Sequence, residues 1–520
     1  MELPKNLPKT IVLLVLDGFG VAPKSRGNAI SLSKTPVLDR LFKNYPHAKI
    51  SASGNEVGLD MGEDGNSEVG HMTMGAGRVI LQLSSRIDES INSGNFYKNE
   101  ELLKALEYAK TNDSHVHLLG LIGGGVVHAS LEHAKALITL CKREKVNPNR
   151  VFFHVITDGR DSEPKSALTY IHELEHHMHK ERVGNISTII GRHYAMDRDE
   201  RWERTLKAYD LYTKAEGKEF ETWEEAVEHN YDSGVVDDQY IEPSVILNYD
   251  SPFPAIDKKD VVIFFNYRAD RAIQISSVFQ DSKLQKQLSR ETIPKLYFLG
   301  FAKYSNHIPK HTAFGKESIV DTLGATLSKH RKYQLRIAES EKFPHVTYFF
   351  NGGRDELFAG EDRVEIPSNK KVKTYDKAPH MKVKEITEEM IKRLEKEKYS
   401  FILANFANAD MVSHTGDIDA TIAAIEYMDG MIGKLVKIVE ANDYILVITA
   451  DHGNAEEMFV DGHLDTKHSN NPVPFVIIGK NIGKSYRLKP AGSLADVAPT
   501  ILNLLGIEKP DSMTGENLIE

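Results

Sequence analysis

Short, continuous runs of apolar residues recur along the chain and predict buried β-strands. They are rich in β-branched or aromatic residues and are bounded by Gly, Asp or Asn, as is typical of strands covered on both faces. The runs are Ile11–Leu16, Val116–Ile122, Val151–Ile156, Ile186–Ile190, Val261–Phe265, Phe401–Phe406 and Tyr444–Thr449. Longer stretches with apolar residues at helical spacing, such as Leu131–Lys142 and Ile418–Val436, lie between them. This alternation predicts an α/β fold with mostly parallel sheets.

Carboxylates follow three of these predicted strands. Asp17 comes directly after the first run, Asp410 comes shortly after Phe401–Phe406, and Asp451 comes shortly after Tyr444–Thr449. In open parallel sheets, ligands bind in the crevice beyond the carboxyl ends of the strands. We therefore expect these three side chains to line one site, although they are far apart in the sequence.

The middle of the chain repeats this arrangement with arginines. Guanidinium groups bind phosphate and carboxylate in a bidentate manner, so a cluster of them predicts a small polyanionic ligand. The alternative is that these arginines are scattered on the surface in local ion pairs. Because carboxylates come from the two ends of the chain and arginines from its middle, we predict two domains, the second inserted into the first. The arginines are Arg160, Arg192, Arg198, Arg268 and Arg271.

Composition narrows the classes of protein that fit. With 41% hydrophobic and 27% charged residues among 520, the chain is not disordered, and its net charge of −10 disfavours broad nucleic-acid binding. No run approaches the ~20 apolar residues of a membrane helix, and Ile11–Leu16 ends in Asp17-Gly18 rather than in a signal-peptide cleavage site. The single cysteine, Cys141, fits a reducing compartment. We expect a soluble, cytoplasmic protein with no nucleic-acid or membrane partner, and a solvated surface for the acidic segment Trp223–Asp238.

Imidazoles accompany the carboxylates in the C-terminal third of the chain. Asp410 and His414 are four residues apart, so one helical turn would place both beside a single ion. Asp451 and His452 are adjacent, and His468 follows in a polar loop. Such ligation without thiolate suits Mn²⁺, Zn²⁺ or Fe²⁺. Any one of these residues alone is better explained as a strand-end cap or a surface histidine, whereas the combination favours metals.

Ser67 lies in the glycine-bounded segment GNSEVGH that begins at Gly65. Its spacing is G-x-S-x-x-G rather than the G-x-S-x-G of the hydrolase nucleophile elbow, so a Ser–His–Asp triad is poorly supported. A divalent cation could activate the serine by lowering the pKa of its hydroxyl, but an ordinary turn serine explains the motif alone better. Another glycine-rich segment, Gly123–Gly125, lacks the third glycine of a dinucleotide loop and is weak support for NAD or ATP binding.

Taken together, these segments resemble the cofactor-independent phosphoglycerate mutases, metalloenzymes of the alkaline phosphatase superfamily. The matching motifs follow the family's order and span nearly the whole chain, and GNSEVGH with GRHYAMDRD is highly specific. The motifs are LDGFG from Leu16, GNSEVGH from Gly65, HASLEHA from His128, TDGRD from Thr157, GRHYAMDRDERW from Gly191, FNYRADRA from Phe265, ESEKFPHVTYFFNGG from Glu339, NFANADMVSHTG from Asn405, TADHGNAE from Thr449 and KHSNNPVPF from Lys467.

The resemblance implies roles for individual residues. One metal would be held by Asp410, His414 and His468. The other would be held by Asp17, Ser67, Asp451 and His452, with Ser67 also the catalytic nucleophile. Asp161 would transfer protons, and Lys342 would contact the phosphoryl group. The substrate would be bound by His128, Arg160, Asp161, Arg192, Arg198, Arg268, Arg271 and Lys342.

The resemblance also implies a fold and a reaction. Residues 1–82 and 317–520 would form a discontinuous alkaline-phosphatase-like domain that binds metal, and residues 83–316 an inserted α/β transferase domain that binds substrate. The enzyme would be a monomer that interconverts 3-phosphoglycerate and 2-phosphoglycerate, in glycolysis and gluconeogenesis, through a phosphoserine on Ser67. It would need two divalent metals, with Mn²⁺ the expected ion, and no 2,3-bisphosphoglycerate.

Three alternatives stay open at this point: a phosphopentomutase, a plain phosphatase of the same superfamily, and a non-catalytic two-domain protein that binds a small anion. The arginine-rich insert with GRHYAMDRD argues against the first two. The third would use the arginines but has no use for Ser67 beside two metal sites.

Overall fold

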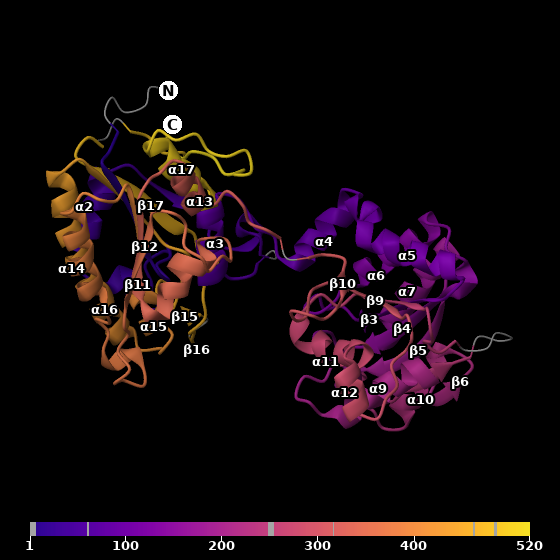
Figure 1. Ribbon diagram of the computed structural model, residues 1–520. Coiled ribbons are helices and arrows are strands. Elements are labelled where there is room, and N and C mark those ends of the chain that lie inside the picture. Colours follow the sequence, from indigo (N-terminus) through magenta and orange to yellow (C-terminus); the bar gives the residue numbers. More distant parts are fainter. Residues whose placement is uncertain (1–6, 60–61, 248–253, 316, 461–462, 483–485) are drawn as a thin grey trace. The chain divides into compact units, whose positions relative to one another are not determined.

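The chain divides into two compact units, each with its own hydrophobic core. A computed structural model describes residues 7–59, 62–247, 254–315, 317–460, 463–482 and 486–520. Unit 1 comprises Met1–Gln82 and Ser318–Glu520, and unit 2 comprises Leu83–Glu317, so unit 2 is inserted into unit 1 (Figure 1). Glu317 groups with unit 2, one residue beyond the predicted boundary. That each unit is a domain with its own binding task stays a prediction.

A seven-stranded sheet forms the centre of unit 1. Its strand order is β12 (Glu361–Ile366), β11 (Gln334–Glu339), β13 (Phe401–Phe406), β1 (Thr10–Leu16), β14 (Tyr444–Thr449), β17 (Val473–Gly479) and β2 (His47–Ile50). The first five strands are parallel, and β17 is antiparallel to both of its neighbours. Every residue of β1, β13 and β14 is buried, which is why these strands are continuous apolar runs in the sequence.

Helices cover both faces of this sheet (Figure 1). On one face α16 (Ile418–Ala441) packs against α2 (Pro36–Asn44) and α14 (Val383–Leu394). On the other face α3 (Ser67–Ala76) packs against α13 (Leu323–Lys329) and α17 (Val497–Leu504). The remaining short elements of unit 1 are α1 (Ala29–Leu32), α15 (Asn408–Ser413), β15 (Phe459–Val460) and β16 (His463–Leu464).

Unit 2 is built around an eight-stranded sheet. Its order is β10 (His311–Thr312), β9 (Tyr297–Gly300), β8 (Val261–Phe264), β3 (Val116–Ile122), β4 (Val151–Thr157), β5 (Asn185–Gly191), β7 (Ser244–Ile246) and β6 (Lys218–Phe220). The first six strands are parallel. Its helices are α4 (Leu83–Asn92), α5 (Glu100–Asn112), α6 (Leu131–Arg143), α7 (Ala167–Glu181), α8 (Arg192–Ala195), α9 (Trp202–Lys214), α10 (Trp223–Asp232), α11 (Ala269–Gln280) and α12 (Ser282–Gln287).

The predicted α/β class and all seven predicted strands are confirmed, with strand ends within one residue. The acidic segment is only partly a solvated surface, because α10 buries Trp223 and the chain beyond it buries Asp238. The Asp238 carboxylate accepts backbone N–H bonds from Ser166 and Ala167, both at 2.8 Å. A buried carboxylate at the start of a neighbouring helix cannot be distinguished by composition from an exposed one. Within the described ranges, no helix combines the length and apolarity needed to cross a bilayer.

Separate cores predict that damage to one unit stays local. Leu13 on β1 and Leu118 on β3 are both fully buried, so replacement of either by alanine is expected to cost about 2–5 kcal/mol of the free energy of unfolding. Hydrogen exchange of the full chain, followed by mass spectrometry, should show faster exchange in β13 and β14 for Leu13→Ala, and in β4 and β8 for Leu118→Ala. Equal acceleration in both units for either variant would show that the units do not unfold separately.

Candidate functional site

Four adjacent parallel strands of unit 1 deliver charged side chains to one edge of its sheet. Lys342 follows β11, Asp410 follows β13, Asp17 follows β1, and Asp451 follows β14, and these strands are neighbours in this order. All four side chains are buried, with 5% or less of each residue exposed. The structure therefore brings together Asp17 of the N-terminal segment and Asp410 and Asp451 of the C-terminal third of the chain, as the strand-end pattern predicted.

The ammonium group of Lys342 lies at the centre of this cluster. It donates hydrogen bonds to Asp17 Oδ1 at 2.6 Å, to Asp410 Oδ2 at 2.7 Å and to Ser67 Oγ at 2.9 Å. Burial alone would lower the pKa of this ammonium, but the charges of Asp17 and Asp410 raise it above its usual value. Lys342 is therefore a permanent cation beside the serine hydroxyl.

One ammonium does not balance the buried carboxylates. Burial and the charge of Asp451 raise the pKa of Asp17 to about 6, a sign that negative charge is in excess here. Asp451 Oδ2 is buried, and its near neighbours are imidazole nitrogens, His71 Nδ1 at 3.2 Å and His452 Nε2 at 3.7 Å. Uncompensated buried charge is costly unless cations or donors neutralise it. These buried carboxylates could therefore bind further cations.

Three histidines direct a lone pair into the same cluster. In each, Nδ1 lies against a main-chain carbonyl oxygen, which can only accept, so Nδ1 carries the proton and Nε2 is left unprotonated in the neutral ring. This is the support that metal-ligating histidines receive in proteins. The carbonyl acceptors are Thr466 for His414 at 2.7 Å, Gly65 for His468 at 2.8 Å and Gly453 for His452 at 3.2 Å.

The three Nε2 atoms converge on the carboxylates. His414 Nε2 and His468 Nε2 are 3.1 Å apart and lie 3.1 Å and 3.4 Å from Asp410 Oδ1. His452 Nε2 lies 3.5 Å from Asp17 Oδ1 and 3.7 Å from Asp451 Oδ2. Ligand atoms in two groups, Asp410–His452–His468 and Asp17–Asp451–His452, lie within 4.8 Å of one another. Carboxylate and imidazole sets of this spacing could hold divalent cations, and His452 belongs to both.

The pKa values of two of these histidines respond to Asp410. Its hydrogen bond raises the pKa of His414 above the usual 6.5. Burial would lower the pKa of His468, but its contact with Asp410 raises it. In turn, although burial opposes the charged form, the charge of Lys342 holds the pKa of Asp410 well below its usual range. Asp410 is thus ionised wherever the histidines titrate.

Ser67 is the first residue of α3, and its neighbours fix its position. The preceding residue, Asn66, caps the helix by accepting a hydrogen bond from the Val69 N–H at 2.9 Å. A Cβ on Gly70 would lie 2.5 Å from the Asp451 carbonyl oxygen, so only glycine lets the helix approach that loop. The helix N-terminus beside Ser67 Oγ carries partial positive charge, which favours an anionic group there.

The contacts of Ser67 differ from those of a Ser–His–Asp triad. Its Oγ lies 2.8 Å from His452 Nε2, as a triad would require. However, the other ring nitrogen of His452 faces the Gly453 carbonyl rather than a carboxylate. Lys342 and Asp17 also contact Oγ, so the hydroxyl is surrounded by proposed metal ligands and a cation.

Several contributors to this cluster were not among the predicted site residues. His71 is fully buried and donates from Nδ1 to the Ser67 carbonyl at 2.9 Å. Asn405 donates to Asp17 Oδ2 at 2.6 Å, and Asn454 donates to Asp410 Oδ1 at 2.9 Å. All three lie within the motifs GNSEVGH, NFANADMVSHTG and TADHGNAE, so membership of these motifs could have identified them as site residues.

The arginines of unit 2 gather at the carboxyl ends of β4, β5 and β8. Arg192 is buried and donates to Asp161 Oδ2 at 2.6 Å and also to Asp158. Asp270 joins two others, accepting from Arg198 at 3.0 Å and from Arg268 at 3.1 Å. The partner carboxylates Asp158 and Asp270 were not predicted; Asp161 was the acidic residue of these motifs to which a role was assigned.

A cavity of about 270 Å³ opens beside these arginines. Arg160, Arg192 and Arg271 line it, together with Arg201 and Arg204, which the sequence analysis did not single out. Burial and the nearby charges of Arg192, Arg198 and Arg160 lower the pKa of Arg271. Mutual repulsion of this kind is what a bound polyanion would relieve.

His128 lies beside the same carboxylates. Its Nε2 is 3.9 Å from Asp161 Oδ2, and its Nδ1 is 3.9 Å from Asp270 Oδ1. Burial and the charge of Arg192 lower the pKa of His128 to about 4, so the ring is neutral at pH 7. The run Gly123–Gly125 packs here too, because a Cβ on Gly125 would lie 2.5 Å from the Asp161 carbonyl oxygen. Close packing therefore explains these glycines without a nucleotide.

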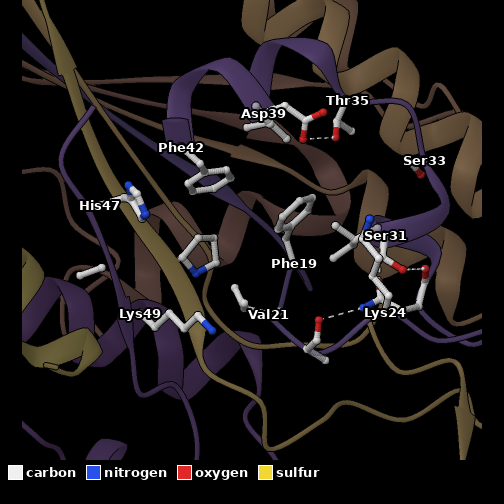
Figure 2. Close-up of a pocket in the computed structure, with 17 residues that line it drawn as sticks. Phe19, Val21, Lys24, Ser31, Ser33, Thr35, Asp39, Phe42, His47 and Lys49 are labelled. Atoms are coloured by element: carbon white, nitrogen blue, oxygen red, sulfur yellow. Dashed lines mark hydrogen bonds between the residues drawn. The ribbon is translucent and has the colours of Figure 1, made fainter. Parts of the chain in front are cut away.

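A separate cavity of about 450 Å³ lies in unit 1 between the loop after β1 and strand β2 (Figure 2). The rings of Phe19 and Phe42 form part of its wall, and Lys24 and Lys49 also line it. None of the predicted site residues lines it, and its single carboxylate, Asp39, bonds to Thr35. The converging carboxylates and imidazoles of unit 1 lie elsewhere.

Comparisons with known proteins agree with this chemistry. Residues 9–509 match the model of the metalloenzyme superfamily. A 2,3-bisphosphoglycerate-independent phosphoglycerate mutase of Clostridium novyi is 46% identical over 98% of this chain and 99% of its own length. A protein of the same name from Clostridioides difficile is 46% identical over 99% of each chain. Among solved structures, a phosphoglycerate mutase of Leishmania mexicana at low cobalt concentration is 30% identical, with a TM-score of 0.56 and coverage of 100% of this chain and 99% of that chain.

These matches extend over nearly the whole chain, unlike a match to one unit alone. They confirm the family resemblance that the ordered motifs indicated. They also bear out the expectation of a metalloenzyme in its general form. The chain belongs to the metalloenzyme superfamily and, within it, to the family of 2,3-bisphosphoglycerate-independent phosphoglycerate mutases.

Proposed function

We propose that this chain interconverts 3-phosphoglycerate and 2-phosphoglycerate through a phosphoserine on Ser67, without 2,3-bisphosphoglycerate. One observation carries the proposal: Ser67 Oγ lies 2.9 Å from Lys342 Nζ and 2.8 Å from His452 Nε2, in a cluster where the Nε2 atoms of three histidines face buried carboxylates. A binding protein for a small anion has no use for such a set. Full-length relatives that bear the mutase name support the choice of substrate.

Two divalent cations would be held by the carboxylates and imidazoles of unit 1. Asp410, His414 and His468 would ligate one, and Asp17, Ser67, Asp451 and His452 the other. Bound divalent cations supply electrostatic stabilisation of the transferring phosphoryl group and of the serine oxygen. The fit rests on the excess of buried negative charge and on the protonated Nδ1 atoms. Mn²⁺ suits these ligands. One chain supplies all of them, so the site needs no second subunit, and we propose a monomer. We also propose a cytoplasmic location.

The residues of unit 1 would carry out the transfer itself. Ser67 Oγ would attack phosphorus and later release the phosphoryl group to the other hydroxyl of glycerate. The Lys342 ammonium, 2.9 Å from that oxygen, would neutralise charge that develops on the phosphoryl oxygens. The N-terminus of α3 would add its partial positive charge at the same place.

The residues of unit 2 would bind the glycerate and move its protons. Arg160, Arg192, Arg198, Arg268 and Arg271, together with neutral His128, would hold the carboxylate and hydroxyl groups. Asp161 would protonate the leaving hydroxyl oxygen and then accept the proton of the attacking one. The bond from Arg192 to Asp161 Oδ2 fixes the orientation of that carboxyl group.

Phosphorus NMR of the full chain with 3-phosphoglycerate and Mn²⁺, without bisphosphoglycerate, tests this function. We expect 2-phosphoglycerate to form in the wild-type protein and not in Ser67→Ala. Asp161→Asn should slow the conversion by about two to four orders of magnitude, the usual contribution of a general acid–base group. It should still form phosphoserine from an aryl phosphate, because a phenolate leaves without a proton.

The outcomes separate the alternatives. Release of inorganic phosphate would indicate a phosphatase, and an unchanged spectrum would indicate a binding protein. Full mutase activity in Asp161→Asn, or loss of its serine labelling while metal content is unchanged, would contradict the division of roles between Ser67 and Asp161.

Metal affinity should depend on pH through the ligands whose pKa values are raised. His414 and His468 have pKa values above 6.5 and Asp17 has a value of about 6, so protons occupy these groups as the pH falls. Calorimetric titration with Mn²⁺ should show full affinity above these values and a loss of about tenfold per pH unit for each proton displaced below them. His414→Gln should bind more weakly at pH 8 with a shallower pH dependence. A flat affinity from about pH 8 to about pH 6 would contradict this ligand set.

A further inference from the structure

A second group of histidine and aspartate side chains lies in unit 2, away from its arginines. His115 directly precedes β3, His117 is the second residue of β3, and Asp260 directly precedes β8, the strand paired with β3. They lie at the amino ends of the strands, whereas the arginines follow the carboxyl ends. A strand of seven residues separates the two edges by about 20 Å. The mechanism proposed above does not use these residues.

The ligand atoms of these three residues are close enough to one another to bind a single ion. His117 Nε2 lies 3.3 Å from Asp260 Oδ2, and His115 Nδ1 lies 3.4 Å from Asp260 Oδ1. All three residues offer ligand atoms within 4.8 Å of one another. Ligands about 2.0–2.1 Å from a tetrahedral zinc ion lie about 3.4 Å from one another. The two imidazole–carboxylate separations are close to this length, each to a different oxygen of Asp260.

Asp260 is already held in place by the backbone. Its Oδ1 accepts the N–H of His115 and its Oδ2 accepts the N–H of Asp257, both at 2.9 Å. The second lone pair of each carboxylate oxygen faces an imidazole nitrogen, and a cation held between them could take its place. His117 and Asp260 are buried, while the side chain of His115 is 36% exposed. The cluster thus combines a fixed interior with one exposed ligand through which an ion could enter.

The strongest observation is the hydrogen-bonded chain behind His117. His117 Nδ1 lies 2.9 Å from His154 Nε2, and His154 Nδ1 lies 2.8 Å from Thr188 Oγ1. When Asp260 accepts the proton of His117 Nε2, His117 Nδ1 accepts from His154 Nε2–H. His154 Nδ1 in turn accepts from the Thr188 hydroxyl. A hydroxyl can also accept, so the whole chain can reverse.

Reversal of this chain is what cation binding would require. A cation on His117 Nε2 requires the other tautomer of this ring, with its proton on Nδ1, where it donates to His154 Nε2. His154 must change tautomer in the same way, so that its Nδ1–H donates to Thr188 and each neutral ring keeps one proton. A metal-ligating histidine needs such an acceptor for its other N–H group. Across β3, β4 and β5 the sheet already supplies it, in two fully buried residues, His154 and Thr188.

We propose that His115, His117 and Asp260 form a zinc-binding site that joins the start of β3 to the start of β8, with His154 and Thr188 as its supporting hydrogen-bond chain. Two imidazoles and one carboxylate with a fourth position left to water are a typical ligand set for Zn²⁺. Because the site is remote from the arginines, its occupancy should stabilise unit 2 without taking part in phosphoryl transfer.

Zinc stoichiometry of the full chain tests this proposal. Protein stripped with chelator is dialysed against micromolar Zn²⁺, and bound zinc is counted by mass spectrometry. His115→Ala should bind one zinc fewer than the wild type, should lose the wild-type rise in thermal midpoint of unit 2, and should keep its mutase activity with Mn²⁺. The matched control is His179→Ala, an exposed histidine at the end of α7, which should bind as many ions as the wild type.

A second variant tests the supporting chain. His154→Phe keeps a ring but removes the acceptor for His117, so zinc should bind this site about 10–100-fold more weakly. Equal zinc stoichiometry in the wild type and His115→Ala would overturn the proposal, as would unchanged affinity in folded His154→Phe. Neither result depends on whether the mutase activity proposed for unit 1 is correct.

Discussion

Concentrated negative charge at one sheet edge is the constraint on which the site in unit 1 depends. Asp17, Asp410 and Asp451 are buried at this edge, and the single ammonium group of Lys342 bonds to Asp17 and Asp410. Buried charge of this density is tolerable only beside cations and donors. The surrounding residues are arranged accordingly: Asn405 and Asn454 donate amide protons, and three histidines place Nδ1 against main-chain carbonyls and Nε2 toward the carboxylates.

Parallel topology explains how one chain assembles both candidate sites. Each strand of a parallel sheet ends at the same edge, so residues distant in sequence meet without long loops. Unit 1 uses this edge for carboxylates and imidazoles, and unit 2 uses the equivalent edge for arginines. In unit 2 the clustered groups are arginines and therefore positive, and Asp158, Asp161 and Asp270 neutralise part of that charge. The two units therefore favour ligands of opposite charge, as a metal-dependent reaction of a phosphorylated acid would require.

The sequence predicted the parts of this arrangement that depend on strand ends. Continuous apolar runs located β1, β13 and β14, and the carboxylates that follow them were identified correctly as neighbours. Strand β11 was not predicted, because Gln334, Arg336 and Glu339 interrupt its apolar pattern. Arg336 is nevertheless fully buried. Its guanidinium carbon lies 5.1 Å from the centre of the Phe350 ring and 5.3 Å from the centre of the Phe401 ring. Lys342, which follows β11, was therefore found only through the family resemblance.

The directions of the hydrogen bonds made by the histidines also could not be predicted from the sequence. Which nitrogen of His414 faces the site depends on the position of the Thr466 carbonyl, and no local pattern encodes that position. The same holds for the chain from Thr188 to Asp260, whose members come from four neighbouring strands or their ends. Tertiary pairing, rather than composition, determines these tautomers.

Lys342 and the proposed cations would share the same buried carboxylates. Calorimetric titration of Lys342→Met with Mn²⁺ tests this, with the exposed Lys329→Met as the matched control. Removal of a buried positive charge near the ligands should strengthen Mn²⁺ binding at least about tenfold, while the mutase reaction is lost because the phosphoryl group loses its ammonium partner. Lys329→Met should bind as the wild type does. Unchanged or weaker Mn²⁺ binding by folded Lys342→Met would show that Lys342 and the cation do not share these carboxylates.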